Sequence, residues 1–104
     1  MTTLRVRPQA DRDTDEAAEF YAREAGIEFA LEFLAGVELA YRRIVETPWA
    51  GAPVTAFEPR LAGLRFWPVP DFETMLVFYV PSPGAIEIVR VLHGARNLPH
   101  RLAE

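Results

Sequence analysis

The sequence predicts an α+β fold of order β-α-α-β-β-β, in which a helical hairpin covers one face of a mostly antiparallel sheet. Two observations predict it. Apolar residues recur at helical spacing in two consecutive segments that Gly26 separates. The last third of the chain holds two apolar runs, 75–80 and 86–92, on either side of the turn sequence Pro81-Ser82-Pro83-Gly84. A helix pair followed by strands is typical of one two-layer domain, which we expect to span residues 1–104.

The first strand and the first helix follow from local patterns. Leu4 and Val6 alternate with arginines as far as Pro8, which indicates a short, half-buried strand. From about Ala10 the apolar stripe has helical spacing, and acidic residues fill the early turns, where the helix dipole favours them. Gly26 then ends this helix.

A second helix is predicted from Ala30 to Ile44 and is stopped by Pro48. Gly36 lies in its interior, where glycine costs about 1 kcal/mol relative to alanine. We therefore expect Gly36 to mark a close contact with the neighbouring helix. The link between the two helices is so short that they must form an antiparallel hairpin.

The remaining chain reads as a loop followed by three strands. Prolines and glycines over 50–63 indicate an ordered loop. Leu64 to Val69 is the next strand, and Pro68 predicts an edge or a bulge near its end because proline cannot donate to a ladder. Met75 to Val80 and Ile86 to Leu92 then pair as an antiparallel hairpin.

Composition excludes several classes of function. The chain has no cysteine, so disulfides and thiolate metal sites are impossible, and all 11 of its basic residues other than histidine are arginine. The net charge of −4 argues against broad nucleic-acid binding, which needs a dense basic surface. No apolar run is long enough to cross a membrane, and the N-terminus lacks a signal peptide, so we expect a cytoplasmic protein.

One constellation has chemical potential, namely Arg65, Arg90, His93 and Arg96. Arginines and a histidine at strand ends could grip a phosphate or an acidic partner, and histidine moves protons near neutral pH. The alternative is structural: Arg65 and Arg90 could pair with nearby acids such as Glu87, Asp71 or Glu73. No catalytic residue, metal site, nucleophile triad or glycine-rich phosphate loop is predicted, and no cofactor is expected.

The order of these features resembles the RelE/ParE superfamily of toxins from type II toxin–antitoxin systems, and its ParE branch most of all. The resemblance rests first on two strands, Val77-Phe78-Tyr79 and the segment from Ile86 to Arg96, whose ending Val91-Leu92-His93-Gly94-Ala95-Arg96 is close to the ParE form. Upstream it rests on Pro8-Gln9-Ala10, the helix from Ala30 to Ile44, Thr47-Pro48-Trp49-Ala50-Gly51 and Leu64-Arg65-Phe66. It implies a toxin that inhibits DNA gyrase, is not an enzyme, and is neutralised by a cognate, ParD-like antitoxin. Direct sequence-specific binding of nucleic acid and contact with a membrane are not implied.

The resemblance also implies where partners bind. Arg65, Arg90, His93 and Arg96 are the candidate contacts with the target, and we expect the heads of the last three to remain in water. Phe20, Ala30 and Phe33 are the candidate antitoxin contacts, on a groove of the helical hairpin.

Two alternatives remain open. One is a RelE-like, ribosome-dependent mRNA endonuclease. Compared with the RelE pattern, the basic pair of the second strand falls on Arg65 and Trp67, Leu76 stands near an arginine position, and no tyrosine follows Arg96. The other is a degenerate toxin fold that only binds its antitoxin.

Overall fold

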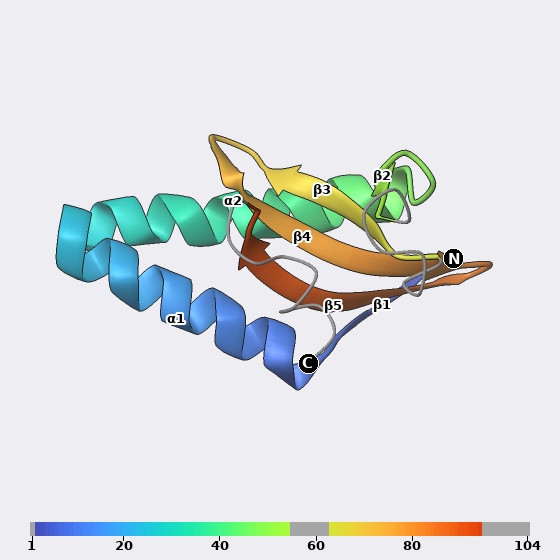
Figure 1. Ribbon diagram of the computed structural model, residues 1–104, viewed down its shortest axis with the longest axis horizontal. Helices are drawn as coiled ribbons and strands as arrows, with labels where there is room; N and C mark the ends of the chain where they lie inside the picture. The colour runs from blue at the N-terminus through green and yellow to red at the C-terminus, as the bar shows by residue number, and fades with distance from the viewer. Residues whose placement is uncertain (1, 55–62, 95–104) are drawn as a thin grey trace.

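The computed structural model describes residues 2–54 and 63–94, and it has two layers (Figure 1). Two helices lie on one face of a five-stranded sheet of order β1-β5-β4-β3-β2. β1 runs parallel to β5, and every other neighbouring pair is antiparallel. The elements are β1 (Thr3–Val6), α1 (Pro8–Ala25), α2 (Ile27–Glu46), β2 (Ala52–Pro53), β3 (Arg65–Val69), β4 (Phe72–Ser82) and β5 (Ala85–His93). The predicted fold class and element order are confirmed, and the two-residue strand β2 is an addition to them.

Both helices begin earlier than the apolar patterns predict. α1 starts at Pro8 rather than near Ala10, because proline at the first helical position needs no N–H partner. α2 starts at Ile27 rather than Ala30, directly after Gly26, whose φ of 97° suits glycine. The chain therefore reverses within one residue, and the two helices pack as the predicted antiparallel hairpin.

The strand region differs from its prediction in two places. The segment predicted as loop contributes β2, whose two residues pair with Phe66 and Arg65 and are too few to show a periodic pattern. β4 continues through Pro81 and Ser82, so the turn to β5 has only Pro83 and Gly84. The φ of Gly84 is 78°, and proline followed by a glycine at positive φ is the pattern of a type II turn.

The main core lies between the helices and the sheet. It includes Phe33 and Ile44 from α2 and Val77, Tyr79 and Ile88 from the strands, all of them fully buried. Gly36 also faces this layer, but its close neighbour is not α1. A Cβ built on Gly36 would lie 2.9 Å from Val69 Cγ1 and 3.0 Å from the Pro70 carbonyl oxygen, so the predicted helix–helix contact is wrong.

Two irregularities shape the sheet. The register of β3 against β4 shifts between Pro68 and Val69, which confirms the predicted bulge at Pro68. β5 carries a second bulge: Ile88 pairs with Tyr79 and Arg90 with Phe78, so Val89 between them has no partner in β4. This second bulge lies just beyond the end of β1, whose last residue in register, Val6, is opposite Ile88.

Candidate functional site

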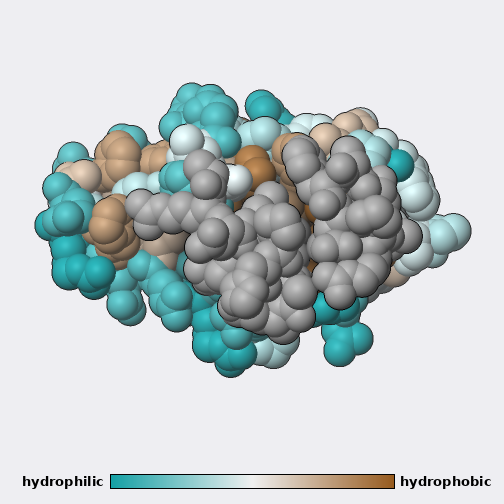
Figure 2. Space-filling view, viewed as in Figure 1, coloured by the Kyte–Doolittle hydropathy of each residue, from teal (hydrophilic) through white to brown (hydrophobic). Residues whose placement is uncertain are grey.

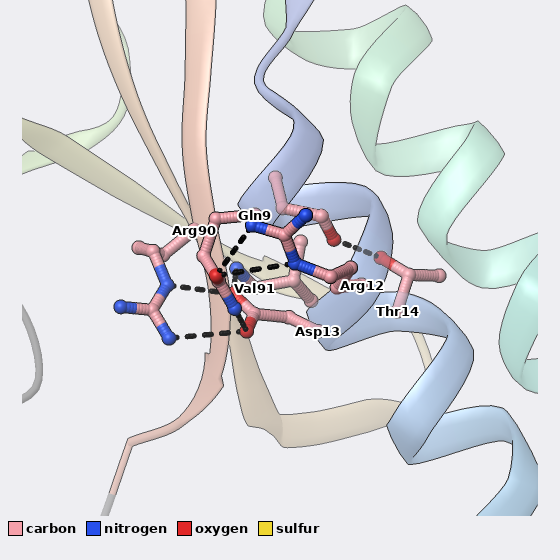
Figure 3. Close-up of polar contacts among 7 residues, drawn as sticks. Gln9, Arg12, Asp13, Thr14, Arg90 and Val91 are labelled. Atoms are coloured by element: carbon pink, nitrogen blue, oxygen red, sulfur yellow. Dashed lines mark hydrogen bonds and ion pairs between the residues drawn. The ribbon is translucent and has the colours of Figure 1, made fainter.

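A buried ion pair joins α1 to the outer edge of β5 (Figure 3). Arg90 Nε donates to Asp13 Oδ2 at 2.8 Å and Arg90 Nη2 donates to Asp13 Oδ1 at 3.1 Å, which is a two-point contact between guanidinium and carboxylate. The exposed fractions of the two side chains are 8% for Arg90 and 2% for Asp13. The pair is therefore shielded from water on both sides.

Asp13 also completes the hydrogen bonding of the sheet edge. β1 ends opposite Ile88, and beyond that point the outer edge of β5 faces α1 instead of a strand. The backbone N–H of Val91 donates to Asp13 Oδ2 at 3.0 Å, so the carboxylate occupies the place of a strand carbonyl. Without it this N–H would be a buried donor lacking a partner, which is costly.

The helix holds the carboxylate in position. Gln9, one turn earlier, donates from Nε2 to Asp13 Oδ1 at 3.1 Å, and Arg12 Nη2 donates in turn to Gln9 Oε1 at 3.0 Å (Figure 3). The neighbouring hydroxyl of Thr14 is satisfied separately, because it donates to the Ala10 carbonyl oxygen at 3.0 Å. The lone pairs of the buried carboxylate are thus taken up by three donors, Arg90, Val91 and Gln9.

The expectation that the head of Arg90 stays in water is wrong. The bulge at Val89 turns Arg90 toward α1, and Asp13 holds it there, so it is unavailable as a target contact. The structural alternative holds for Arg90, although with a partner that was not foreseen. Of the three acids named in that alternative, Glu87 instead accepts from Arg7 Nη2 at 2.6 Å, and this hydrogen bond lowers the pKa of the Glu87 carboxyl.

Arg65 lies in a different cluster, at the start of β3. Its Nη1 donates to the Gly51 carbonyl oxygen at 2.6 Å and to that of Trp49 at 3.1 Å, and its guanidinium lies 5.6 Å from the centre of the Trp49 ring. The hydroxyl of Tyr79 donates to the Pro48 carbonyl oxygen at 2.9 Å and accepts from the Gly51 N–H at 3.0 Å. Burial raises the pKa of Tyr79, which keeps this hydroxyl a donor.

Only glycine fits at position 51. A Cβ at position 51 would collide with the hydroxyl and ring of Tyr79. Arg65 therefore fastens the chain after α2 to the sheet through backbone carbonyls, and not through Glu87, Asp71 or Glu73, the acids that the structural alternative named.

His93 lies at the opposite end of the sheet from Arg65. It pairs with Met75, whereas Arg65 pairs with Tyr79, four residues further along β4. Four residues of strand span about 13 Å, so the side chains of Arg65 and His93 do not converge. Arg96 lies outside the described residues. Arg65 and His93 therefore do not form one site, and Arg90 is buried against Asp13 and belongs to neither group.

A groove of about 250 Å³ opens beside His93, between α1 and the ends of β4 and β5. Phe20 and Tyr21 line its helix side, and Met75 and Leu92 line its strand side. Asp13, Glu16, Ala17, Val91 and His93 complete the lining. The wall is largely apolar, and half of the Phe20 side chain is exposed.

The three candidate antitoxin contacts do not share this groove. Phe20 lines it, but Ala30 and Phe33 of α2 are buried inside the protein and are only 3% and 0% exposed. The assignment of Ala30 and Phe33 to a binding groove is wrong, because the rotation of α2 places them in the core. The Phe33 ring instead contacts Tyr21 and Phe72 at centroid distances of 5.0 and 5.4 Å.

Within residues 2–54 and 63–94, no three His, Cys, Asp or Glu side chains lie close enough to hold a metal ion. No helix in this part of the chain is long and apolar enough to cross a membrane.

Comparison with known proteins decides the family. Residues 4–98 match the family described as the ParE toxin of the type II toxin–antitoxin system parDE. The chain belongs to the ParE toxin family. It is accordingly a toxin of a type II toxin–antitoxin system.

A solved structure, described as the chromosomal ParDE TA system from P. aeruginosa, resembles this ParE-family toxin with a TM-score of 0.73. The two chains are 19% identical, and the match covers 89% of this chain and 96% of the other. At this identity the likeness shows the fold alone. No curated protein matches the chain.

The sequence contained one signal for the ion pair of this ParE-family toxin. Asp13 falls on the same helical stripe as Ala10 and Ala17, and Arg90 interrupts the apolar run over 88–92. A charged residue inside each of two apolar patterns indicates a buried pair more strongly than it indicates a binding surface.

Asp13→Ala should lower the free energy of unfolding by about 3–5 kcal/mol, because it leaves the Arg90 charge buried and the Val91 N–H without its acceptor. Urea unfolding followed by circular dichroism measures this. Glu16→Gln, an exposed acid on the same helix, is the control and should change stability by less than about 0.5 kcal/mol.

The double variant Asp13→Leu, Arg90→Met should recover a large part of that loss, since an apolar pair avoids the desolvation of two charges. A single Asp13→Ala variant as stable as the parent toxin would show that the pair contributes nothing to the fold.

Proposed function

We propose that this toxin arrests growth by binding DNA gyrase through protein–protein contact, and that a ParD-like antitoxin neutralises it by occupying the groove beside Phe20. Both steps take place in the cytoplasm. The observation that carries the proposal is that Arg65, Arg90 and His93 do not form one cluster in this chain of the ParE family. Arg90 is buried against Asp13, and Arg65 lies at the end of the sheet remote from His93.

This division bears on the endonuclease alternative. Cleavage of RNA requires several cationic or proton-transferring groups aimed at one phosphate. Arg65 donates to two backbone carbonyls and packs on Trp49, so its guanidinium is already occupied. His93 lines the groove beside Phe20, whereas Arg65 and Arg90 are not among the residues that line it. We therefore propose that the toxin acts without nuclease activity.

The groove beside Phe20 supports the antitoxin part of the proposal. It is open, largely apolar and placed where the hairpin extends past the sheet. Such a groove suits an amphipathic helix or strand that folds on contact. Phe20 offers a half-exposed aromatic ring at its rim, and aromatic residues dominate the energetics of such interfaces.

Phe20→Ser should weaken antitoxin binding by about thirtyfold, the loss expected for an aromatic anchor worth about 2 kcal/mol. The antitoxin encoded beside the toxin gene is the ligand, and isothermal titration calorimetry gives the affinity. Trp49→Ser is the control because Trp49 is also an exposed aromatic residue, at 59% against 50% for Phe20, but lies in the Arg65 cluster. Unchanged binding by Phe20→Ser, or an equal loss in Trp49→Ser, would place the antitoxin elsewhere.

Purified toxin should inhibit gyrase supercoiling and accumulate cleaved DNA, while mRNA in a translation extract remains uncut. His93→Ala should reduce both the gyrase effect and growth arrest without lowering the melting temperature, since His93 is half-buried at the rim of a groove rather than in the core. Codon-phased mRNA cuts would instead support the endonuclease. A folded, antitoxin-binding chain that leaves growth unaffected would support the degenerate toxin.

A further inference from the structure

We propose that the outer face of the hairpin tip, formed by Glu24, Ile27, Glu28, Leu31 and Glu32, binds a positively charged amphipathic helix of a partner protein. This surface is separate from the groove beside Phe20, and the inference does not depend on the proposed function. It rests on an exposed apolar row next to an acidic row on α2.

The apolar row is exposed beyond what the fold requires. Four of the five exposed large hydrophobic side chains within the described residues lie between positions 20 and 31. Phe20 lines the groove and the Phe29 ring packs on Tyr21 and Phe72, which leaves Ile27 and Leu31 as the apolar row. Ile27 and Leu31 are 66% and 56% exposed, stand one helical turn apart, and do not belong to either core cluster. Figure 2 shows hydrophobic and hydrophilic surface side by side at the end of the molecule where the helices meet. Apolar surface gathered in this way is typical of an interaction site.

The acidic row runs beside it. Glu28 and Glu32 stand one turn apart, and each follows a residue of the apolar row, so the two rows lie about 100° apart around the helix. None of Glu24, Glu28 and Glu32 makes an ion pair with a described residue. The helix dipole accounts for Glu28 in the first turn of α2, but Glu24 lies in the last turn of α1, where a negative charge opposes the dipole. Glu28 and Glu32 also repel each other.

The charge of the tip selects its partner. Residues 15–32 carry six carboxylates and one arginine, a net charge of −5. This charge repels nucleic acid, anionic membranes and the same tip of a second copy. It attracts a helix with leucine-like residues in one row and arginine or lysine in the next, which can cover Ile27 and Leu31 while pairing with Glu28 and Glu32.

The test uses the full chain and two labelled synthetic helical peptides of about 18 residues, which share one leucine face and carry either arginine or glutamate on the polar face. Fluorescence anisotropy at about 0.05 M and about 0.5 M salt measures binding, because salt screens exposed charge pairs. The arginine peptide should bind, more weakly at the higher salt, and the glutamate peptide should not.

Two variants locate the binding. Leu31→Ser should weaken it by about tenfold or more, as expected for an apolar anchor. The double variant Glu28→Gln, Glu32→Gln should weaken it up to about fivefold for each lost ion pair and reduce the salt dependence. Glu46→Gln with Glu73→Gln, exposed acids away from the tip, is the charge-matched control and should bind as the parent does. Circular dichroism confirms that each variant is folded.

Equal binding of the two peptides, or binding that Leu31→Ser leaves unchanged, would overturn the proposal. So would a stable self-association of the chain, measured by sedimentation, that Leu31→Ser abolishes, because the tip would then be covered by a second copy.

Discussion

The carboxylate of Asp13 is the one group on which both layers of the toxin depend. β1 is too short to cover the whole edge of β5, and beyond Ile88 that edge faces a helix that has no free backbone acceptors to offer. Asp13 supplies the acceptor for Val91 and neutralises Arg90 at the same point. Burying two charges is costly, and the cost is offset here because their hydrogen-bonding groups meet partners. The pair therefore fixes where α1 lies along the sheet.

The position of α1 in turn defines the candidate binding surfaces. The groove beside Phe20 has one wall on α1 and the other on β4 and β5, so its width follows from the contact between Asp13 and Arg90. The tip of the helical hairpin extends beyond the end of the sheet at which β5 finishes (Figure 1). At the other end, Tyr79 and Arg65 fasten the chain after α2 to the sheet through Pro48, Trp49 and Gly51. Both ends of the sheet are thus fixed by polar contacts, and the end near His93 carries the exposed apolar surface.

Much of the fold could be predicted because periodicity and turn residues act locally. Gly26 and Pro83-Gly84 determine where the chain reverses, and the apolar rows determine which faces are buried. The site could not be predicted to the same degree. The direction in which the Arg90 side chain points depends on the bulge at Val89, and its ion-pair partner depends on the length of β1. Neither feature can be predicted from the sequence of β5 by itself. Ala30 and Phe33 were misplaced for a related reason, since only the packing of α2 shows which side of the helix faces the sheet.

Native-state hydrogen exchange of the Val91 amide tests most directly whether Asp13 replaces a strand at the edge of β5. If it does, the Val91 N–H exchanges only through global unfolding, with a protection factor like that of Val77 in the centre of the sheet. Exchange of Val91 on the timescale of an open sheet edge, while Val77 remains protected, would show that the carboxylate does not cap the strand and would contradict the account.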